Sequence, residues 1–179
     1  MRQGKVRYIG SSTFPAWQLV ESYWVADKRG FARFICEQPP YHLFDRRIEN
    51  EVLPVCRKYG TAVIPWSPLA GGWLTGKYRR GHPLPEEGRH LKAMQNPDDP
   101  AVARRLDAIE RLVPLAEEVG ATLSQLALAW NMRQPGITAP IIGPRTMAQL
   151  EDNLKAAEVR LDAQILERID QICPKGQQI

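Results

Sequence analysis

Four turn-like segments of the chain hold small and polar residues of types that could bind a ligand. Each segment directly follows a short apolar run, and they are residues 10–13, 37–41, 66–72 and 143–146. In the first, Ser12 and Thr13 carry hydroxyls that can hydrogen-bond an amide. In the second, Gln38 offers a donor and an acceptor at one tip, which matches a carboxamide. These two segments predict the end of a pocket that holds an amide.

The third and fourth segments suit a flat ring and an anion. Trp66 precedes small residues such as Gly71, which allow backbone N–H groups to approach a phosphate. Gly143 and Arg145 stand at the start of an expected helix, where a guanidinium and a helix N-terminus can surround one anion. Taken singly, each segment is most often an ordinary cap, turn or core residue. Together they describe a pocket for a nicotinamide dinucleotide, which has an aromatic amide at one end and phosphates beyond it.

Alternating strand and helix patterns must position these segments. Four apolar runs have the length of strands buried on both faces, at residues 6–10, 32–38, 61–66 and 139–143. Apolar residues at helical spacing predict helices at residues 17–29, 48–59, 101–119 with an interruption at Pro114, 123–133, 146–156 and 163–173. This order predicts βαβ units and a parallel sheet. A Gly-, Pro-, Arg- and Asp-rich loop at residues 67–100 is long enough to be functional.

Single residues mark where several of these helices begin, stop or bend. Gly30 and Gly60 follow apolar helical patterns and predict stops. Thr146 is the expected cap of its helix, with Gln149 at the capping-box position. Pro54 lies inside the pattern of residues 48–59 and predicts a kink there.

Composition limits the class of protein. The chain has 179 residues, which fits one domain, and its net charge of +4 is spread without a basic run, so a nucleic-acid groove is not indicated. Cys36, Cys56 and Cys173 show no metal-ligand spacing, so we expect no zinc site and a reducing compartment. There is no signal-like start and no apolar run near the ~20 residues of a membrane helix. We therefore expect a soluble, cytoplasmic protein.

Three blocks of residues resemble the aldo-keto reductase family. They are GKVRYIGSS at residues 4–12, WSPLAGG followed by LTGKY at residues 66–78, and IIGPR at residues 141–145 with Gln149 and Asn153. The resemblance covers residues 4–173. It implies an α/β fold of the (β/α)8 TIM-barrel family, of which this chain holds about four βα units, strands five to eight, plus a C-terminal helix. It also implies NADP, bound as NADPH, as the cofactor.

The same resemblance assigns cofactor contacts by position. Ser12 and Gln38 would hold the nicotinamide carboxamide beside Thr13, which stands where the family usually has Asn, and Trp66 would stack on the ring. The residues implied along the pyrophosphate are Ser67, Leu69, Gly71 and Lys77. The residues implied at the adenosine end are Gly143, Arg145, Gln149 and Asn153. Arg145 would contact the 2′-phosphate, which implies a preference for NADP over NAD.

The catalytic Asp, Tyr, Lys and His of that family lie on its first four strands, outside this chain. We therefore assign no catalytic residue, and we expect His42, His82 and His90 to be ordinary surface histidines. Residues 1–179 are interpreted as the C-terminal half of the barrel, with residues 67–100 as a cofactor and substrate loop.

The resemblance implies that the full-length enzyme reduces aldehydes or ketones with NADPH, and that this chain alone is inactive. An alternative is a non-catalytic, NADP-binding regulatory subunit of the potassium-channel β-subunit type. A third interpretation, a half-barrel that pairs with a second copy, is less favoured because the two halves of this family differ in sequence.

Overall fold

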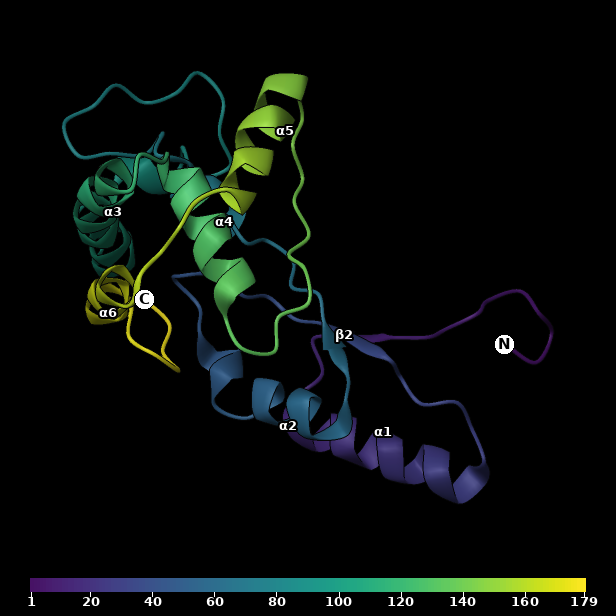
Figure 1. Ribbon diagram of the computed structural model, residues 1–179. Helices are drawn as coiled ribbons and strands as arrows, with labels where there is room; N and C mark the ends of the chain where they lie inside the picture. The colour runs from purple at the N-terminus through teal and green to yellow at the C-terminus, as the bar shows by residue number, and fades with distance from the viewer.

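An open sheet of three parallel strands forms the centre of the computed structural model, which describes residues 1–179. The strands are short and lie in chain order: β1 (Ser11–Ser12), β2 (Cys36–Gln38), which is labelled in Figure 1, and β3 (Ala62–Val63). The register pairs Ser11 with Glu37 and Cys36 with Ala62. The expected parallel α/β arrangement is confirmed, with three strands in place of four.

The fourth apolar run, at residues 139–143, does not form the strand that we expected. It joins the sheet only through single parallel bridges, Val63 to Ile137 and Trp66 to Ile141. The Ile141 amide donates to the Pro65 carbonyl at 2.8 Å. Pro140 lies between the two bridges, and proline has no N–H to donate to a ladder. The run is therefore apolar and correctly placed, but its hydrogen bonding is interrupted.

The first apolar run is also displaced from the expected strand. β1 begins at Ser11, and before it the Ile35 amide donates to the Ile9 carbonyl at 3.0 Å. Val6 and Tyr8, which precede this edge strand, are 49% and 69% exposed. Residues 6–10 therefore continue the edge of the sheet without regular pairing on either side.

Helices α1 (Ala16–Arg29) and α2 (Val52–Tyr59) lie side by side against the sheet (Figure 1). Both end where predicted, because Gly30 and Gly60 adopt left-handed backbone angles with φ of 61° and 68°. The expected kink at Pro54 is wrong. The chain instead forms a separate 3-10 turn, η1 (Arg47–Glu49), and α2 begins afterwards, so Pro54 falls in its first turn, where its missing N–H costs little.

Three further helices contribute a large share of the core: α3 (Pro100–Glu118), α4 (Leu123–Arg133) and α6 (Ala163–Ile172). Their facing side chains are buried, among them Leu106, Ile109, Leu126, Trp130, Ile165 and Ile169. The interruption expected at Pro114 is absent, and α3 runs through it. A proline inside a helix costs ~3 kcal/mol, whereas each fully buried Leu or Ile of α3 contributes ~1.5–3 kcal/mol. Packing of this face therefore offsets the lost hydrogen bond.

A buried guanidinium ties the segment after β2 to α6. Arg46 is 1% exposed; its Nε donates to Glu49 at 2.7 Å and its Nη1 to Asp170 at 2.7 Å. The same Nη1 donates to the Cys173 carbonyl at 2.6 Å, and the guanidinium lies over the Trp130 ring at 5.0 Å. Hydrogen bonds to both carboxylates satisfy a charge that would otherwise be costly to bury.

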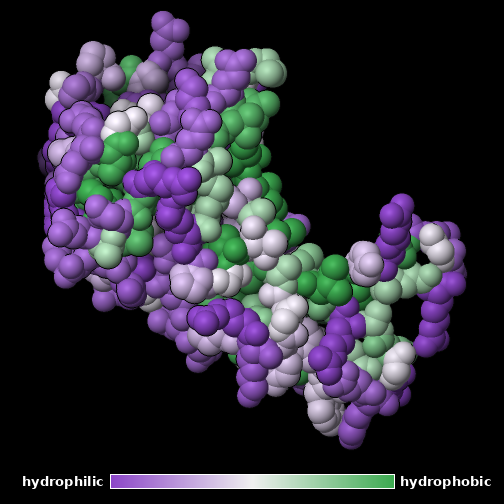
Figure 2. Space-filling view, viewed as in Figure 1, coloured by the Kyte–Doolittle hydropathy of each residue, from purple (hydrophilic) through white to green (hydrophobic).

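The remaining elements carry the segments that could bind a ligand. They are η2 (Ala70–Thr75), η3 (Ala93–Gln95), α5 (Met147–Leu154) and η4 (Lys155–Ala157). Figure 2 shows a molecule in two parts, with hydrophobic side chains in the hollow between the helical body and the N-terminal arm. No helix is long and apolar enough to span a bilayer.

Candidate functional site

Residues from two of the neighbouring turns donate hydrogen bonds to the backbone carbonyl oxygen of Gln38, which lies in the turn between them. The Ser12 hydroxyl donates to it at 2.9 Å, the Thr13 amide at 3.2 Å and the Trp66 indole N–H at 3.1 Å. Parallel pairing of Ser12 with Gln38 brings β1 and β2 to the same edge, and a bridge between Pro40 and Trp66 adds the turn after β3. The structure therefore brings together the four residues that we expected at the amide end of the pocket.

Trp66 is 38% exposed, so it is a partly open aromatic surface and not a core residue. Its N–H is fixed by the Gln38 carbonyl, which sets the orientation of the indole plane. Gln38 itself is only half-buried. An exposed ring fixed beside an accessible carboxamide is an arrangement that can hold an aromatic amide.

The backbone of the turns at this edge is strained. The non-glycine residues with positive φ are Thr13 at 61°, Ser67 at 55° and Ala70 at 52°, and all of them lie in the turns after β1 and β3. Left-handed angles at such residues cost ~1–3 kcal/mol each, and they concentrate at ligand sites, where the surrounding structure imposes them. Gly71 and Gly72 continue the same conformation with φ of 65° and 109°. The surrounding structure therefore imposes one particular backbone conformation on the turns at this edge of the sheet.

Cations approach the glycine turn from the long loop. A Cβ atom on Gly72 would lie 3.7 Å from the Lys77 Nζ, and one on Gly71 would lie 3.6 Å from the Arg89 Nη1. Ser67 and Leu69 accept from the backbone within the same turn, at 2.8 Å from Ala70 and 2.9 Å from Gly72. Positive side chains beside left-handed glycines form a surface suited to a phosphate group. Arg89 was not among the predicted residues, because no motif surrounds it in the sequence.

His90 anchors the loop above this turn. Its ring stacks on Trp73 with centroids 4.8 Å apart, and its amide donates to the Tyr78 hydroxyl at 3.0 Å. Burial lowers the pKa of the imidazole from its ordinary value; the Ala70 backbone opposes this shift, and the Arg105 and Arg89 charges lower the pKa further. The imidazole therefore packs against Trp73 in the manner of an aromatic residue.

The expectation that all three histidines lie on the surface is wrong for two of them. His42 is half-buried, its Nδ1 has no hydrogen-bond partner, and burial lowers its pKa to about 4. His90 is half-buried against Trp73, whereas His82 is exposed. The long loop folds back on the helices and partly buries His90, and packing of the segment after β2 partly buries His42. Tertiary packing of this kind leaves no local pattern in the sequence.

The turn at residues 143–146 starts α5 as predicted, with a changed capping pattern. The Thr146 hydroxyl accepts from the Gln149 amide at 3.3 Å, which confirms the cap. The Gln149 carboxamide accepts from the Arg145 amide at 2.8 Å, one residue before the capping-box partner. Gly143 is exposed and Asn153 half-buried on the same turn and helix.

The Arg145 guanidinium is 69% exposed and lies 3.6 Å from Glu87 of the long loop. Its acidic neighbour in sequence, Asp152, accepts from the Gln125 amide group at 2.7 Å, so Glu87 is the carboxylate that faces the Arg145 guanidinium. The bridge between Trp66 and Ile141 connects the segment that leads into this turn with the turn after β3.

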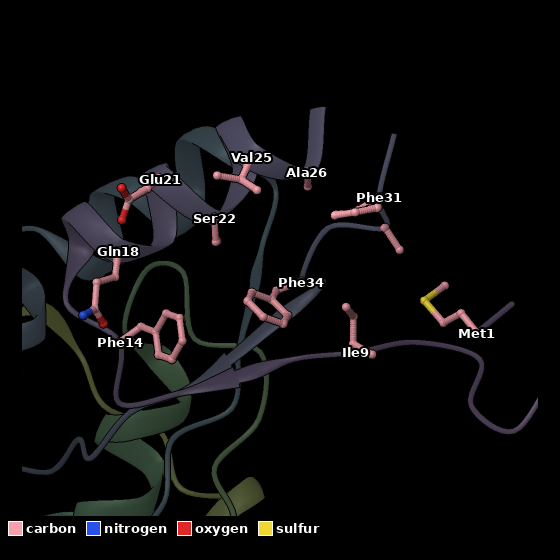
Figure 3. Close-up of a pocket in the computed structure, with 11 residues that line it drawn as sticks. Met1, Ile9, Phe14, Gln18, Glu21, Ser22, Val25, Ala26, Phe31 and Phe34 are labelled. Carbon is pink, nitrogen blue, oxygen red and sulfur yellow. The ribbon is translucent and has the colours of Figure 1, made fainter. Parts of the chain in front are cut away.

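An apolar groove lies on the other side of β1. Figure 3 shows Phe14, Phe34 and Ile9 pointing into the space between the first strand and α1, with Val25 above them. Phe14 and Phe34 pack edge to face at 5.9 Å, and Phe31 at the end of the groove is 56% exposed. Open apolar surface of this kind is typical of sites where a protein, a membrane or a ligand binds.

Comparison with known proteins agrees with the sequence blocks. Residues 1–174 match the model of the Aldo/keto reductase family. The chain is 41% identical over 174 residues to an uncharacterized oxidoreductase, YrpG, of Bacillus subtilis, covering 97% of this chain and 51% of that protein. It is 36% identical over 177 residues to a probable voltage-gated potassium channel subunit beta of Arabidopsis thaliana, covering 95% of this chain and 53% of the relative. A putative subunit of the same kind in Schizosaccharomyces pombe is 34% identical, with 96% and 52% covered.

The chain spans about half the length of the curated relatives it matches, which holds for the oxidoreductase and for both channel subunits. The family match extends over nearly the whole sequence and includes every segment that contributes to the site. The chain therefore belongs to the aldo/keto reductase family.

Proposed function

We propose that this chain is the cofactor-binding, C-terminal half of an NADPH-dependent oxidoreductase that reduces aldehydes or ketones. The observation that carries the proposal is the convergence of Ser12, Thr13 and Trp66 on the Gln38 carbonyl, beside the strained glycine turn. A hydroxyl, an accessible carboxamide and an exposed indole match the amide and the ring of nicotinamide.

The rest of the site suits the remaining parts of the dinucleotide. Gly71 and Gly72 open the backbone beside Lys77 and Arg89, and the chemistry of these donors suits a pyrophosphate. Arg145, at the N-terminus of α5, offers a guanidinium and a helix dipole to a further phosphate. The residues present therefore fit NADPH, which supplies the hydride when bound. This chain's own residues bind the cofactor, orient its ring and neutralise its phosphates.

The proton for carbonyl reduction would come from residues outside this chain. Tyr41 is buried and donates to Glu49 at 2.6 Å, and burial raises the pKa of its phenol far above the ordinary value. The Tyr78 hydroxyl accepts from the His90 amide within the loop cluster. Neither phenol stands ready to protonate a substrate in the site, which supports the assignment of catalysis to the complementary half.

The apolar groove also supports a protein in which this chain binds the cofactor and a complementary half supplies the catalytic residues. The relatives are about twice as long as this chain, and the groove and the unpaired side of β1 are where a closed barrel would continue. We infer that the complementary half of such a barrel covers Phe31, Ile9 and the neighbouring groove residues. This groove would then be an interface between the two halves, and it is exposed in this chain without the complementary half.

Titration of the full chain with NADPH and with 2′,5′-ADP, followed by fluorescence, tests the proposed function. We expect saturable binding of both, because 2′,5′-ADP carries the phosphate that Arg145 would hold. A chain that binds neither ligand contradicts the proposal.

The channel-subunit relatives favour a second candidate, a regulatory subunit that binds NADP without turnover. Both candidates share the cofactor site, so binding alone does not separate them. Adding the complementary half separates them: reduction of an aldehyde by the reconstituted protein favours the enzyme, and binding without turnover favours the regulatory subunit.

A further inference from the structure

Glu37 is a carboxylate buried at the centre of the sheet, one residue before Gln38. Its exposed fraction is 0%, whereas Cys36 and Gln38 on either side of it are half-buried, as the alternation of a strand requires. The Ser11 hydroxyl donates to its Oε2 at 2.5 Å, and the Phe14 amide donates to its Oε1 at 3.0 Å. Both partners are neutral groups. Burying a carboxylate without a cation is costly, so its presence in the core calls for a role.

The two hydrogen bonds hold the two ends of one turn. Ser11 and Phe14 bracket Ser12 and Thr13, the residues that contact the Gln38 carbonyl. Thr13 has a φ of 61°, an angle that a threonine adopts only when its surroundings impose it. The carboxylate supplies that constraint, since one rigid group accepts from both sides of the strained residue.

We propose that Glu37 is a positioning residue for the amide end of the cofactor site. It fixes the turn at residues 11–14 so that the Ser12 hydroxyl and the Gln38 carboxamide face the same ligand group. Glu37 cannot touch the ligand, because it lies buried beneath the turn, so its effect passes through Ser12 and Thr13. The proposal rests on the proposed function, and it adds a specific prediction about which end of the cofactor depends on Glu37.

Two variants of the full chain remove the constraint in different ways. Glu37→Gln keeps the size of the side chain, but its NH2 group cannot accept a hydrogen bond, so one end of the turn is released. Ser11→Ala removes one donor and leaves the carboxylate in place. The matched control is Tyr23→Phe, which removes a buried hydrogen bond of 2.7 Å to Thr61 without touching the turn.

Each variant is titrated with NADPH, which uses both ends of the site, and with 2′,5′-ADP, which uses only the adenosine end. We expect Glu37→Gln and Ser11→Ala to weaken NADPH binding about tenfold, as loss of an oriented polar contact does. Binding of 2′,5′-ADP should stay within about twofold of wild type in all variants. Tyr23→Phe should change neither ligand's affinity, although it removes a buried hydrogen bond.

The ratio of the two affinities is the decisive readout, because a general loss of folded protein lowers both together. Equal losses for NADPH and 2′,5′-ADP, or unchanged NADPH binding, overturn the positioning role of Glu37 while the proposed function stands. If Glu37→Gln does not fold, Ser11→Ala decides the question by the same ratio. A wild-type chain that binds neither ligand overturns the proposed function, and the role of Glu37 with it.

Discussion

The Nη1 atom of Arg145 lies 3.6 Å from the Oε2 atom of Glu87, so the turn before α5 faces a carboxylate of the long loop. Both side chains are mostly exposed, at 69% and 81%. An exposed pair of this kind contributes only ~0–1 kcal/mol, so a phosphate that also meets a helix N-terminus can displace the carboxylate.

Arg145→Ala should weaken NADPH binding by about ten- to a hundredfold. The reason is the loss of charge-assisted hydrogen bonds to the 2′-phosphate, worth roughly 1.5–3 kcal/mol each. NADH lacks that phosphate, so its affinity should hardly change. Fluorescence titration of both cofactors against wild type and variant measures the difference, and equal losses for the two would exclude a phosphate role.

Glu87→Gln is the matched variant on the other side of the pair. Removing the carboxylate frees the guanidinium and takes a negative charge away from the phosphate, so NADPH affinity should rise slightly or stay unchanged. The same titrations measure it. A large loss of NADPH affinity would show that Glu87 holds the site open and does not compete for Arg145.

The purified chain should not reduce aldehydes with NADPH at a rate above background. Tyr41 is buried against Glu49, and burial lowers the pKa of the His42 and His90 imidazoles, so none of these three groups is placed to protonate a carbonyl in the site. Following NADPH oxidation with a panel of aldehydes checks this. Steady turnover that disappears when one of the chain's own residues is replaced would show that catalytic residues lie within it.

The exposed edge beside β1 should make the isolated chain self-associate. Tyr8 is 69% exposed there, and a lysine at an edge strand opposes pairing with another chain. Tyr8→Lys should therefore reduce concentration-dependent light scattering without lowering the melting temperature. Trp17→Lys is the control, because Trp17 is 62% exposed on α1, away from the edge. Equal effects of the two variants would mean that general surface hydrophobicity, and not the edge, drives association.

Stability should fall as the pH decreases from about 6.5 toward 4. Burial lowers the folded-state pKa of His42 from 6.5 to about 4, so the neutral ring stabilises the fold above the unfolded pKa, and this contribution is lost as the solution becomes acidic. The loss amounts to at most about 3 kcal/mol. Urea unfolding of wild type and His42→Phe at several pH values measures it, and the variant should show a flatter profile. Identical profiles would contradict the burial of His42.

Local signals in the sequence predicted where α1 and α2 end and that the sheet is parallel. Gly30 and Gly60 stop their helices because a left-handed angle is a property of the residue itself. The fourth strand, expected at residues 139–143, does not form for an equally local reason, because Pro140 has no N–H group to donate to the neighbouring strand. The candidate turns could be identified because each follows an apolar run, and turns at the carboxyl ends of parallel strands lie at the same edge of a sheet.

What the sequence could not show depends on packing between distant segments. Arg89 lies beside Gly71 only because the long loop folds back over η2. Glu37 looks like an ordinary charged residue until its burial between the strands and the helices is seen. The burial of His42 also follows from the segment after β2 packing on the helical body, which no periodicity records.

The contact between Arg46 and Asp170 spans 124 residues of sequence, so it can form only after most of the chain has been synthesised. β1, β2 and β3 all lie within residues 11–63, so their parallel pairings can form before the rest of the chain has been synthesised. Arg46 has no second carboxylate until residue 170 has been made, roughly 6–25 seconds later at ordinary elongation rates. During that interval Arg46 has Glu49 as its only carboxylate partner, and the helical core still lacks α6. The final packing of that core is therefore a late event, and the growing polypeptide is most exposed to chaperones and proteases before α6 arrives.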